Sequence, residues 1–376
     1  MKLSIRKHAL LEAIQVVSKA VAVRTPKQVL TGILLTAESN RLVATAYDLE
    51  LAIQTHIEIN EDTGLSVIAE GSIVLPARYF ADMVRKLPED QVTLQVDHNY
   101  MTEITSGLAQ FHLHGIDAAE FPKLPEFHGA QSLNISSDLL HTLITSTSFA
   151  AANTEVRPIL TGIHVVCDGR GLTFTATDGL RLATRSAAIA QTQTQPWNAI
   201  IPAKSLAELA KLLPDSDESI TMQITHTHSL FMIGTTNFYT RMIDGAYPDT
   251  TRIIPTSSRT ELIVNTTELM NAIDRAALIA RERENNMVRL QLDDTTITVS
   301  SSSPEIGNVS ESLKANAKTG DDMAIAFNAK YVLDALKALR SSEVVVRFNG
   351  WNQPFTFREV GNEEFGLQLI SPVLMR

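Results

Sequence analysis

Two pairs of histidines have a spacing that would suit a metal ion. His112 and His114, and likewise His226 and His228, are separated by one residue, so on a strand both imidazoles of a pair would lie on one face. Zinc sites need further ligands, and neither pair has a nearby cysteine or an evident carboxylate. We therefore expect no metal site. The single cysteine, Cys167, excludes an internal disulfide and a cysteine-based zinc site.

Two other segments resemble catalytic motifs only in part. Residues 169–171, Gly-Arg-Gly, lack the Gly-Lys-Ser/Thr ending and the following helix of a phosphate-binding loop, and a hairpin turn is expected there. Asp178 and Arg181 could act as an acid and an electrophile, but a turn-capping aspartate is the commoner use of this pattern. We expect no catalytic site and no cofactor. A metal-dependent hydrolase that uses the histidine pairs or Asp178 is kept as an alternative.

The composition is typical of a globular protein of several domains. Of the 376 residues, 44% are hydrophobic and 20% are charged, and about 150 residues per domain suggests two or three domains. No apolar stretch approaches the roughly 18 residues of a membrane span, and charged residues interrupt any signal peptide, so we expect a cytoplasmic protein. The net charge of −10 argues at first against nucleic acid, because proteins that neutralise phosphates are usually basic.

An internal repeat of about 126 residues organises the chain. Residues 75–78, 201–204 and 327–330 read Leu-Pro-Ala-Arg, Ile-Pro-Ala-Lys and Phe-Asn-Ala-Lys, at spacings of 126 residues. Each segment precedes an apolar stripe of helical period, and a second such stripe opens each copy. Between the stripes, apolar and polar residues alternate as in strands. We predict an α+β fold of three similar domains, 1–128, 129–254 and 255–376, each with two helices packed on antiparallel sheet.

The charges are divided unequally between the predicted elements. The six predicted helices, residues 7–20, 76–87, 136–152, 202–213, 266–283 and 328–340, carry 13 Lys and Arg against eight Asp and Glu. The helices are thus positive within an acidic chain. If their exposed faces share one surface, that surface attracts anions despite the net charge. Lys and Arg are also ordinary residues of exposed helix faces, so charge alone does not decide for nucleic acid.

Two short segments complete a family resemblance. Residues 177–183, Thr-Asp-Gly-Leu-Arg-Leu-Ala, and residues 243–249, Ile-Asp-Gly-Ala-Tyr-Pro-Asp, together with three repeats of this length, resemble the bacterial DNA sliding clamp, the beta subunit of DNA polymerase III. The resemblance runs from Met1 to the tail at 369–373. It implies a head-to-tail homodimeric ring whose helices line the hole and whose sheets form the outside.

This resemblance implies a non-catalytic function. The ring would encircle double-stranded DNA without sequence specificity. It would tether the catalytic subunit of the replicative DNA polymerase and other replication and repair proteins through short Leu/Phe-containing motifs, and so confer processivity. A separate ATP-driven clamp loader would open the ring, because the chain has no nucleotide-binding loop of its own. The alternative of the same fold is a protein-binding scaffold with no role on DNA.

The resemblance also implies three sets of site residues. DNA-binding residues would be Arg24, Thr154, Arg157, Lys204 and Lys337. A partner-peptide groove between the second and third domains, an apolar cleft with two arginines at its rim, would comprise Leu160, Thr177, Gly179, Leu180, Arg181, Leu182, Pro248, Arg252, Ile253, Ile370, Pro372 and Val373. Such a cleft can hold Leu and Phe side chains of an extended peptide. The dimer interface would pair Phe111 and Leu113, on an edge strand, with Leu278 and Ile279, at the end of a helix.

Three features depart from the family pattern. Pro158 and Ile159 stand where the family often has aromatic residues, so stacking on a DNA base is not expected there. Leu180 occupies a position that is often His, and the last three residues, 374–376, also differ. Both changes concern the preference of the groove for particular peptides.

Overall fold

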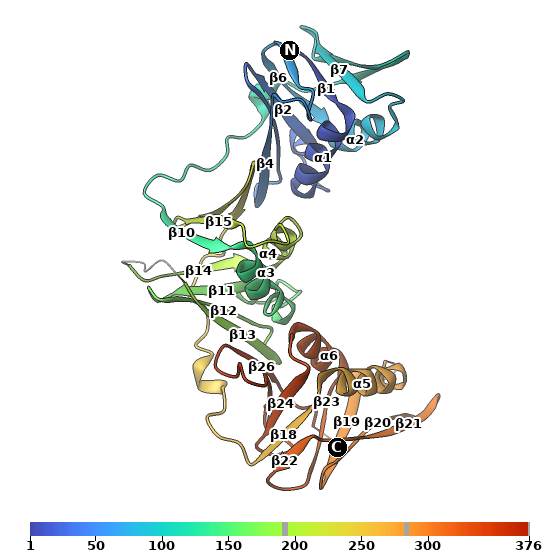
Figure 1. Ribbon diagram of the computed structural model, residues 1–376, viewed down its shortest axis with the longest axis vertical. Coiled ribbons are helices and arrows are strands. Elements are labelled where there is room, and N and C mark those ends of the chain that lie inside the picture. The colour runs from blue at the N-terminus through green and yellow to red at the C-terminus, as the bar shows by residue number, and fades with distance from the viewer. Residues whose placement is uncertain (190–194, 282–285, 375–376) are drawn as a thin grey trace. The chain divides into compact units, whose positions relative to one another are not determined.

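The computed structural model describes residues 1–189, 195–281 and 286–374. Each of the six predicted helices is present, and Figure 1 shows them beside extended antiparallel sheets. Their bounds are α1 (Lys7–Val17), α2 (Ala77–Lys86), α3 (Ser137–Thr145), α4 (Ala203–Ala210), α5 (Thr266–Ala280) and α6 (Ala329–Ala338). The predicted α+β class is confirmed. No helix in the described residues combines the length and the apolar character needed to span a membrane.

Several helices end earlier than their apolar stripes predict. After α1 the chain continues as a 3₁₀-helix at Ser18–Ala20, and after α3 another spans Ser148–Ala150. The Ser18 hydroxyl donates to the Ile14 carbonyl at 2.5 Å and the Thr147 hydroxyl to the Leu143 carbonyl at 2.7 Å. Such side-chain hydrogen bonds occupy carbonyls at the helix end and favour termination.

The described chain forms two compact units. The first contains residues 1–138 and 211–242, and the second contains residues 139–210 and 243–376. These units do not follow the sequence repeats, because two sheets continue across the repeat boundaries. Strand β17 (Thr236–Arg241) pairs with β4 (Leu51–Glu58), and β13 (Arg181–Ala188) pairs with β26 (Gly366–Ile370). The division into three domains, 1–128, 129–254 and 255–376, stays a prediction.

The first unit holds two antiparallel sheets. Their strand orders are β5-β1-β7-β8-β9 and β10-β15-β16-β17-β4-β3-β2-β6. The strands are β1 (Lys2–Arg6), β2 (Gly32–Glu38), β3 (Arg41–Tyr47), β4 (Leu51–Glu58), β5 (Ser66–Ala69), β6 (Gly71–Pro76), β7 (Gln91–Val96), β8 (Met101–Ser106), β9 (Ala109–His114), β10 (Gln131–Ser136), β15 (Ser219–Ile224), β16 (His228–Ile233) and β17 (Thr236–Arg241). Helix α1 packs on α2 and on β4, and its Leu10, Ile14 and Val17 are buried.

The second unit holds the other two antiparallel sheets. Their strand orders are β14-β11-β12-β13-β26-β25-β24-β18-β22 and β21-β20-β19-β23. The strands are β11 (Gly162–Cys167), β12 (Gly171–Thr177), β13 (Arg181–Ala188), β14 (Trp197–Pro202), β18 (Thr260–Asn265), β19 (Met287–Asp293), β20 (Thr296–Ser303), β21 (Gly307–Lys314), β22 (Ala317–Thr319), β23 (Met323–Asn328), β24 (Glu343–Phe348), β25 (Phe355–Glu359) and β26 (Gly366–Ile370). Helix α5 packs on α6 and on β20.

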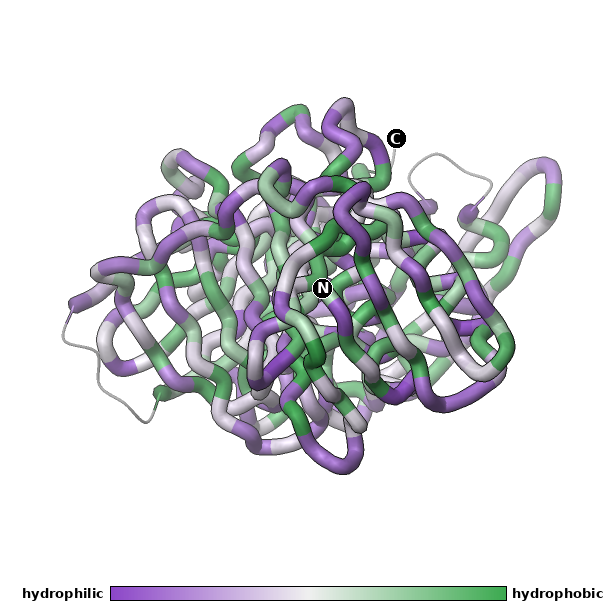
Figure 2. The backbone as a smooth tube through the Cα atoms, turned by 90° about the horizontal axis from the view of Figure 1, so that it is seen from above, coloured by the Kyte–Doolittle hydropathy of each residue, from purple (hydrophilic) through white to green (hydrophobic). Residues whose placement is uncertain are grey.

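Hydrophobic and hydrophilic residues follow one another closely along the backbone, as Figure 2 shows. In many strands, such as β1 and β19, this alternation gives one buried and one more exposed face, whereas β26 is buried along its whole length. In the second unit the buried faces meet in a core that includes Phe327, Phe348 and Phe355, and the rings of Phe348 and Phe355 stack with centroids 5.5 Å apart. The core therefore fixes the positions of the helices and turns that carry the candidate site residues.

Candidate partner-binding surface and DNA-facing elements

A tight turn joins β12 to β13 and carries four of the predicted peptide-binding residues. Asp178 Oδ1 accepts hydrogen bonds from the backbone N–H groups of Leu180 at 2.9 Å and Arg181 at 3.1 Å. Gly179 has φ +95°, a conformation that favours glycine. The expected turn-capping role of Asp178 is confirmed. The turn leaves the Leu180 side chain 55% exposed.

Arg181 is buried beneath this turn. Its side chain is 3% exposed, and its Nε and Nη1 donate to Asp178 Oδ2 at 2.9 Å and to Asp334 Oδ2 at 2.8 Å. The guanidinium carbon also lies 4.5 Å from the ring centre of Tyr331 and 5.5 Å from that of Phe149. The expectation of two arginines at the rim is therefore wrong for Arg181, because two carboxylates and two aromatic rings hold it inside.

The C-terminal segment runs beside the turn. Strand β26 pairs with β13 in a register that places Ile370 opposite Arg181. Beyond the strand, Ser371 N–H donates to the Leu180 carbonyl at 2.9 Å and Val373 N–H donates to the Ala326 carbonyl at 2.7 Å. These bonds fix residues 371–373 along the turn and β23, so that the tail forms one side of the predicted surface.

Residues 247–254, which overlap the second family segment at 243–249, contact the turn through Tyr247. The Tyr247 hydroxyl accepts a hydrogen bond from Thr177 N–H at 3.1 Å. Arg252 is 87% exposed and pairs with Asp249, with Nε and Oδ2 3.2 Å apart. Ile253 is 49% exposed, whereas Ile254 packs against the cluster of Leu182, Leu367 and Leu369. The surface thus receives Pro248, Arg252 and Ile253 from this segment.

The predicted peptide-binding residues divide into a surface layer and a supporting layer. The exposed or half-buried members are Gly179, Leu180, Pro248, Arg252, Ile253, Pro372 and Val373. The buried members are Leu160, Thr177, Arg181, Leu182 and Ile370. We call the exposed set the peptide surface. The buried set acts on it through packing and hydrogen bonds, since these side chains are covered.

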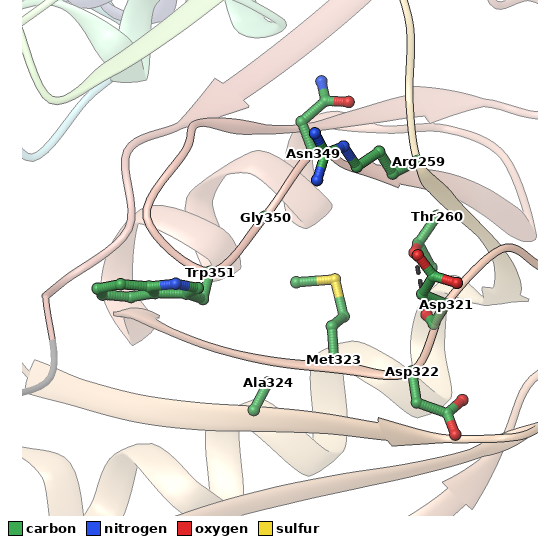
Figure 3. A pocket seen from close by; sticks show the side chains of 9 residues that line it. All are labelled: Arg259, Thr260, Asp321, Asp322, Met323, Ala324, Asn349, Gly350 and Trp351. Carbon is green, nitrogen blue, oxygen red and sulfur yellow. Dashed lines mark hydrogen bonds between the residues drawn. The ribbon is translucent and has the colours of Figure 1, made fainter.

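A cavity in the same unit lies apart from the peptide surface. It has a volume of about 430 Å³, and no residue of either layer lines it. Figure 3 shows Trp351 and Met323 on its wall, with Arg259 and Asp321 nearby. Sequence reasoning did not single out these residues, because they lie at the ends of strands with no motif around them.

His164 and Tyr247 pack against each other beside the turn, where the Tyr247 hydroxyl accepts the hydrogen bond from Thr177 N–H. Their rings stack with centroids 5.0 Å apart. Burial lowers the pKa of His164 from its ordinary value of 6.5, although a hydrogen bond with Asn198 opposes the shift. Burial also raises the pKa of Tyr247 to about 12, so this hydroxyl stays protonated at neutral pH.

We expect the free energy of unfolding to decrease as the pH falls below 6.5, in part because of His164. Above that pH the imidazole is neutral in both states. Below it the unfolded chain takes up a proton more readily than the folded chain, until the pH passes the lowered pKa of the folded state. Denaturant titrations of the wild type and of His164→Phe, which keeps a ring against Tyr247, measure this contribution. Identical pH dependence in the two proteins would contradict it.

Two loops carry three of the five predicted DNA-binding residues, and both loops are closed by the same kind of backbone hydrogen bond. In the first, Ala22 N–H donates to the Leu30 carbonyl at 3.0 Å, and in the second Ala152 N–H donates to the Leu160 carbonyl at 2.8 Å. Seven residues therefore separate the anchors in each loop, and Arg24 occupies the same place as Thr154. Arg24, Thr154 and Arg157 are all exposed. By the same correspondence, Lys27 in the first loop occupies the place of Arg157 in the second. Lys27 was not predicted from the sequence as a DNA-binding residue.

The helices add cations in a regular register that also went unnoticed in the sequence. The second helix of each repeat has a cation near its start and an acid four residues later, and a second cation follows three residues after the acid; in the second repeat this last cation lies directly after the end of α4. The three sets are Arg78, Asp82 and Arg85; Lys204, Glu208 and Lys211; and Lys330, Asp334 and Lys337. In α2 and α6 the two cations are seven residues apart within the helix and therefore share a helix face. Within the described residues, Lys204 and Lys337 are exposed and make no ion pair.

Family models cover almost the whole chain. The N-terminal, central and C-terminal domains of the DNA polymerase III beta subunit match residues 1–125, 134–249 and 251–373. The chain belongs to this family.

Sliding clamps of known structure share the fold. The chain is 44% identical to the beta sliding clamp of Bacillus subtilis over 376 residues, 99% of each sequence, and 37% identical to that of Staphylococcus epidermidis over 375 residues, 99% of each. The crystal structure of the Bacillus subtilis DNA polymerase sliding clamp matches with a TM-score of 0.97 at 42% identity, and the beta chain from Streptococcus pneumoniae with 0.96 at 31%; both matches cover 100% of each chain. The resemblance seen in the sequence is confirmed, and with it the sliding-clamp function.

The residues predicted to form the clamp dimer interface lie at sheet edges or beside them. Phe111 and Leu113 are on β9, which is an edge strand of its sheet as predicted. Phe111 is half-buried, whereas Leu113 is only 8% exposed. Leu278 is 59% exposed near the end of α5, and Ile279 is half-buried. Helix α5 packs on β21, which is the edge strand of another sheet. Both predicted halves of the interface therefore lie on or next to an edge strand, and an edge strand can pair with another chain.

The histidine pairs do not assemble a metal site in this clamp structure. His112 and His114 are both exposed on β9. Within residues 1–189, 195–281 and 286–374, no group of three His, Cys, Asp or Glu side chains is arranged to hold a metal ion.

Proposed function

We propose that this chain forms a head-to-tail homodimeric ring around double-stranded DNA. It acts there as the non-catalytic processivity subunit of a DNA polymerase in the cytoplasm. The observation that carries the proposal is the match to sliding clamps along the whole chain, both in sequence and in fold. Two chains would give six similar domains, and the interface would join the edge near Phe111 to the edge near Leu278.

The charge distribution supports this function. The chain has a net charge of −10, yet exposed cations recur at corresponding positions of its helices and loops. Phosphate contacts of this kind fix no sequence, whereas hydrogen bonds to base edges would. A ring held by its closed shape needs only such weak contacts, and weak contacts permit sliding. The DNA-binding residues we propose are Arg24, Thr154, Arg157, Lys204 and Lys337.

Partner proteins would bind the ring at the peptide surface. Leu180, Ile253 and Val373 offer apolar side chains, and Arg252 offers an exposed guanidinium. An extended segment with Leu and Phe side chains, from the polymerase or from other replication and repair proteins, would bury against them. A separate clamp loader would supply the ATP-driven opening of the ring.

We expect Arg24→Ala to weaken duplex DNA binding uniformly across DNA sequences. Each lost phosphate contact reduces the magnitude of the slope of log affinity against log salt by about 0.9, and a homodimeric ring carries two copies of Arg24. Fluorescence anisotropy with a labelled 30-base-pair duplex (about three helical turns) over a salt series measures this slope.

Arg41→Ala is the matched control, because Arg41 pairs with Glu38 at the turn between β2 and β3 at 2.6 Å and is not among the predicted DNA-binding residues. The proposal predicts an unchanged slope for this control. Equal slopes for Arg24→Ala and the wild type would remove Arg24 from the DNA contacts.

A further inference from the structure

One carboxylate on α6 links Arg181, which supports the peptide surface, to Lys330, an exposed cation of the same helix. Asp334 Oδ2 accepts a hydrogen bond from Arg181 Nη1 and another from Lys330 Nζ, both at 2.8 Å. Arg181 lies 3% exposed beneath the turn that carries Leu180, whereas the Lys330 side chain is 63% exposed. A single oxygen is therefore shared between a buried cation and a cation that reaches the solvent.

The repeat identifies Lys330 as a DNA-facing residue by position. It is the first cation of its helix, as are Arg78 in α2 and Lys204 in α4, at spacings of 126 residues. In α2 the corresponding acid, Asp82, pairs with Arg85 of its own helix at 3.0 Å. Asp334 reaches Arg181, which lies 153 residues earlier in the chain. In the third repeat the acid thus keeps a pair within its own helix and also contacts another element.

Arg181 controls the turn through its backbone. Its N–H donates to Asp178 and its carbonyl accepts from the Thr177 hydroxyl at 2.6 Å. It also pairs with Ile370 at the end of β26, directly before the tail. A firmer hold on Arg181 therefore orders the turn and the tail together. A surface that is already ordered loses less conformational entropy when a peptide binds.

We propose that Asp334 is a positioning residue that makes peptide binding depend on DNA. A phosphate near α6 attracts Lys330 away from the shared oxygen. The carboxylate is then neutralised by Arg181 alone, which strengthens the buried pair. DNA inside the ring thereby increases the affinity of the peptide surface, and by linkage a bound peptide increases the affinity for DNA by the same factor. The inference rests on the proposed function.

The experiment compares peptide binding with and without duplex DNA. The probe is a fluorescein-labelled peptide with a Leu-Ala-Leu-Phe core, and the effector is an unlabelled linear 30-base-pair duplex (about three helical turns) at saturating concentration and low salt. A linear duplex threads a closed ring without a loader. We expect the duplex to tighten peptide binding about fivefold in the wild type.

Variants distinguish the coupling of peptide binding to DNA, which we call the link, from a general loss of structure. Lys330→Ala should bind the peptide without DNA as tightly as the wild type does with DNA, and should show no further response. Asp334→Asn should bind more weakly and also show no response, whereas a merely structural role would lower both affinities and leave their ratio unchanged. Asp82→Asn removes the same charge at the corresponding position of α2 and should keep the fivefold response. Lys204→Ala removes a proposed DNA contact but leaves Asp334 and its partners in place. It should therefore reach the same fivefold increase in peptide affinity, but at a higher DNA concentration.

The possible failures are distinguishable. If the wild type binds neither the peptide nor the duplex, the proposed function fails and the link fails with it. If it binds both, but peptide affinity is the same with and without DNA, only the link is overturned. A response that survives in Lys330→Ala and Asp334→Asn would likewise exclude Asp334 as its carrier.

Discussion

Replacing Arg181 with alanine is expected to lower the free energy of unfolding by about 3 kcal/mol and to abolish measurable peptide binding. The substitution removes the one cation that pairs with both Asp178 and Asp334. Their side chains are 16% and 22% exposed, and the remaining access to water keeps the expected cost at the lower end of the range for buried pairs. Denaturant unfolding and peptide anisotropy measure the two effects.

Arg181→Lys is the control that keeps the positive charge of the side chain but not its hydrogen-bond geometry. A lysine keeps the positive charge, but it cannot donate two separate hydrogen bonds from a planar fork or stack on Tyr331 in the same way. We expect it to recover part of the stability and little of the peptide affinity. Peptide affinity at the wild-type level in Arg181→Ala would show that the buried arginine does not hold the turn.

Replacing Leu278 with aspartate is expected to convert the dimer into a monomer of 41.2 kDa. The side chain is 59% exposed in the single chain, so the substitution should not affect folding of the chain. In the ring, however, an unpaired carboxylate would be buried at each of two identical interfaces, at a cost of several kcal/mol apiece. Light scattering gives the solution mass, and the loss of the dimer should also abolish retention on circular DNA.

Ile68→Asp is the matched control for the interface. Ile68 is 62% exposed on β5, which is the edge opposite β9 in the same sheet. This variant introduces the same charge at an exposed apolar position and should remain a dimer. A dimeric Leu278→Asp protein would contradict the interface, and a monomeric Ile68→Asp protein would place it at the wrong edge.

Features that depend on near neighbours in the chain were predictable from the sequence. The apolar stripes located all six helices. The turn capped by Asp178 was predicted from this aspartate and the residues that directly follow it. The repeat spacing of 126 residues located corresponding helices and strands. These signals are local because helix periodicity and turn capping involve residues only a few positions apart.

Features that depend on distant partners could not be predicted in the same way. Arg181 was expected at a rim, since nothing near it in the sequence indicates that Asp334 and Tyr331 would enclose it. The pairing of β17 with β4 and of β13 with β26 joins repeats edge to edge, and such pairing has no signal in single strands. The cations of α2, α4 and α6 had a signal, their common register in the repeat, which becomes evident once the helix bounds are aligned.

The central claim is that a closed ring holds this protein on DNA, and retention on circular DNA tests it most directly. Protein loaded onto a nicked circular duplex should stay bound through gel filtration at a salt concentration that abolishes its binding to short linear duplexes. Cutting the circle once should release it, because the ring then slides off the ends. Equal retention on circular and linearised DNA, or none on either, would contradict the claim.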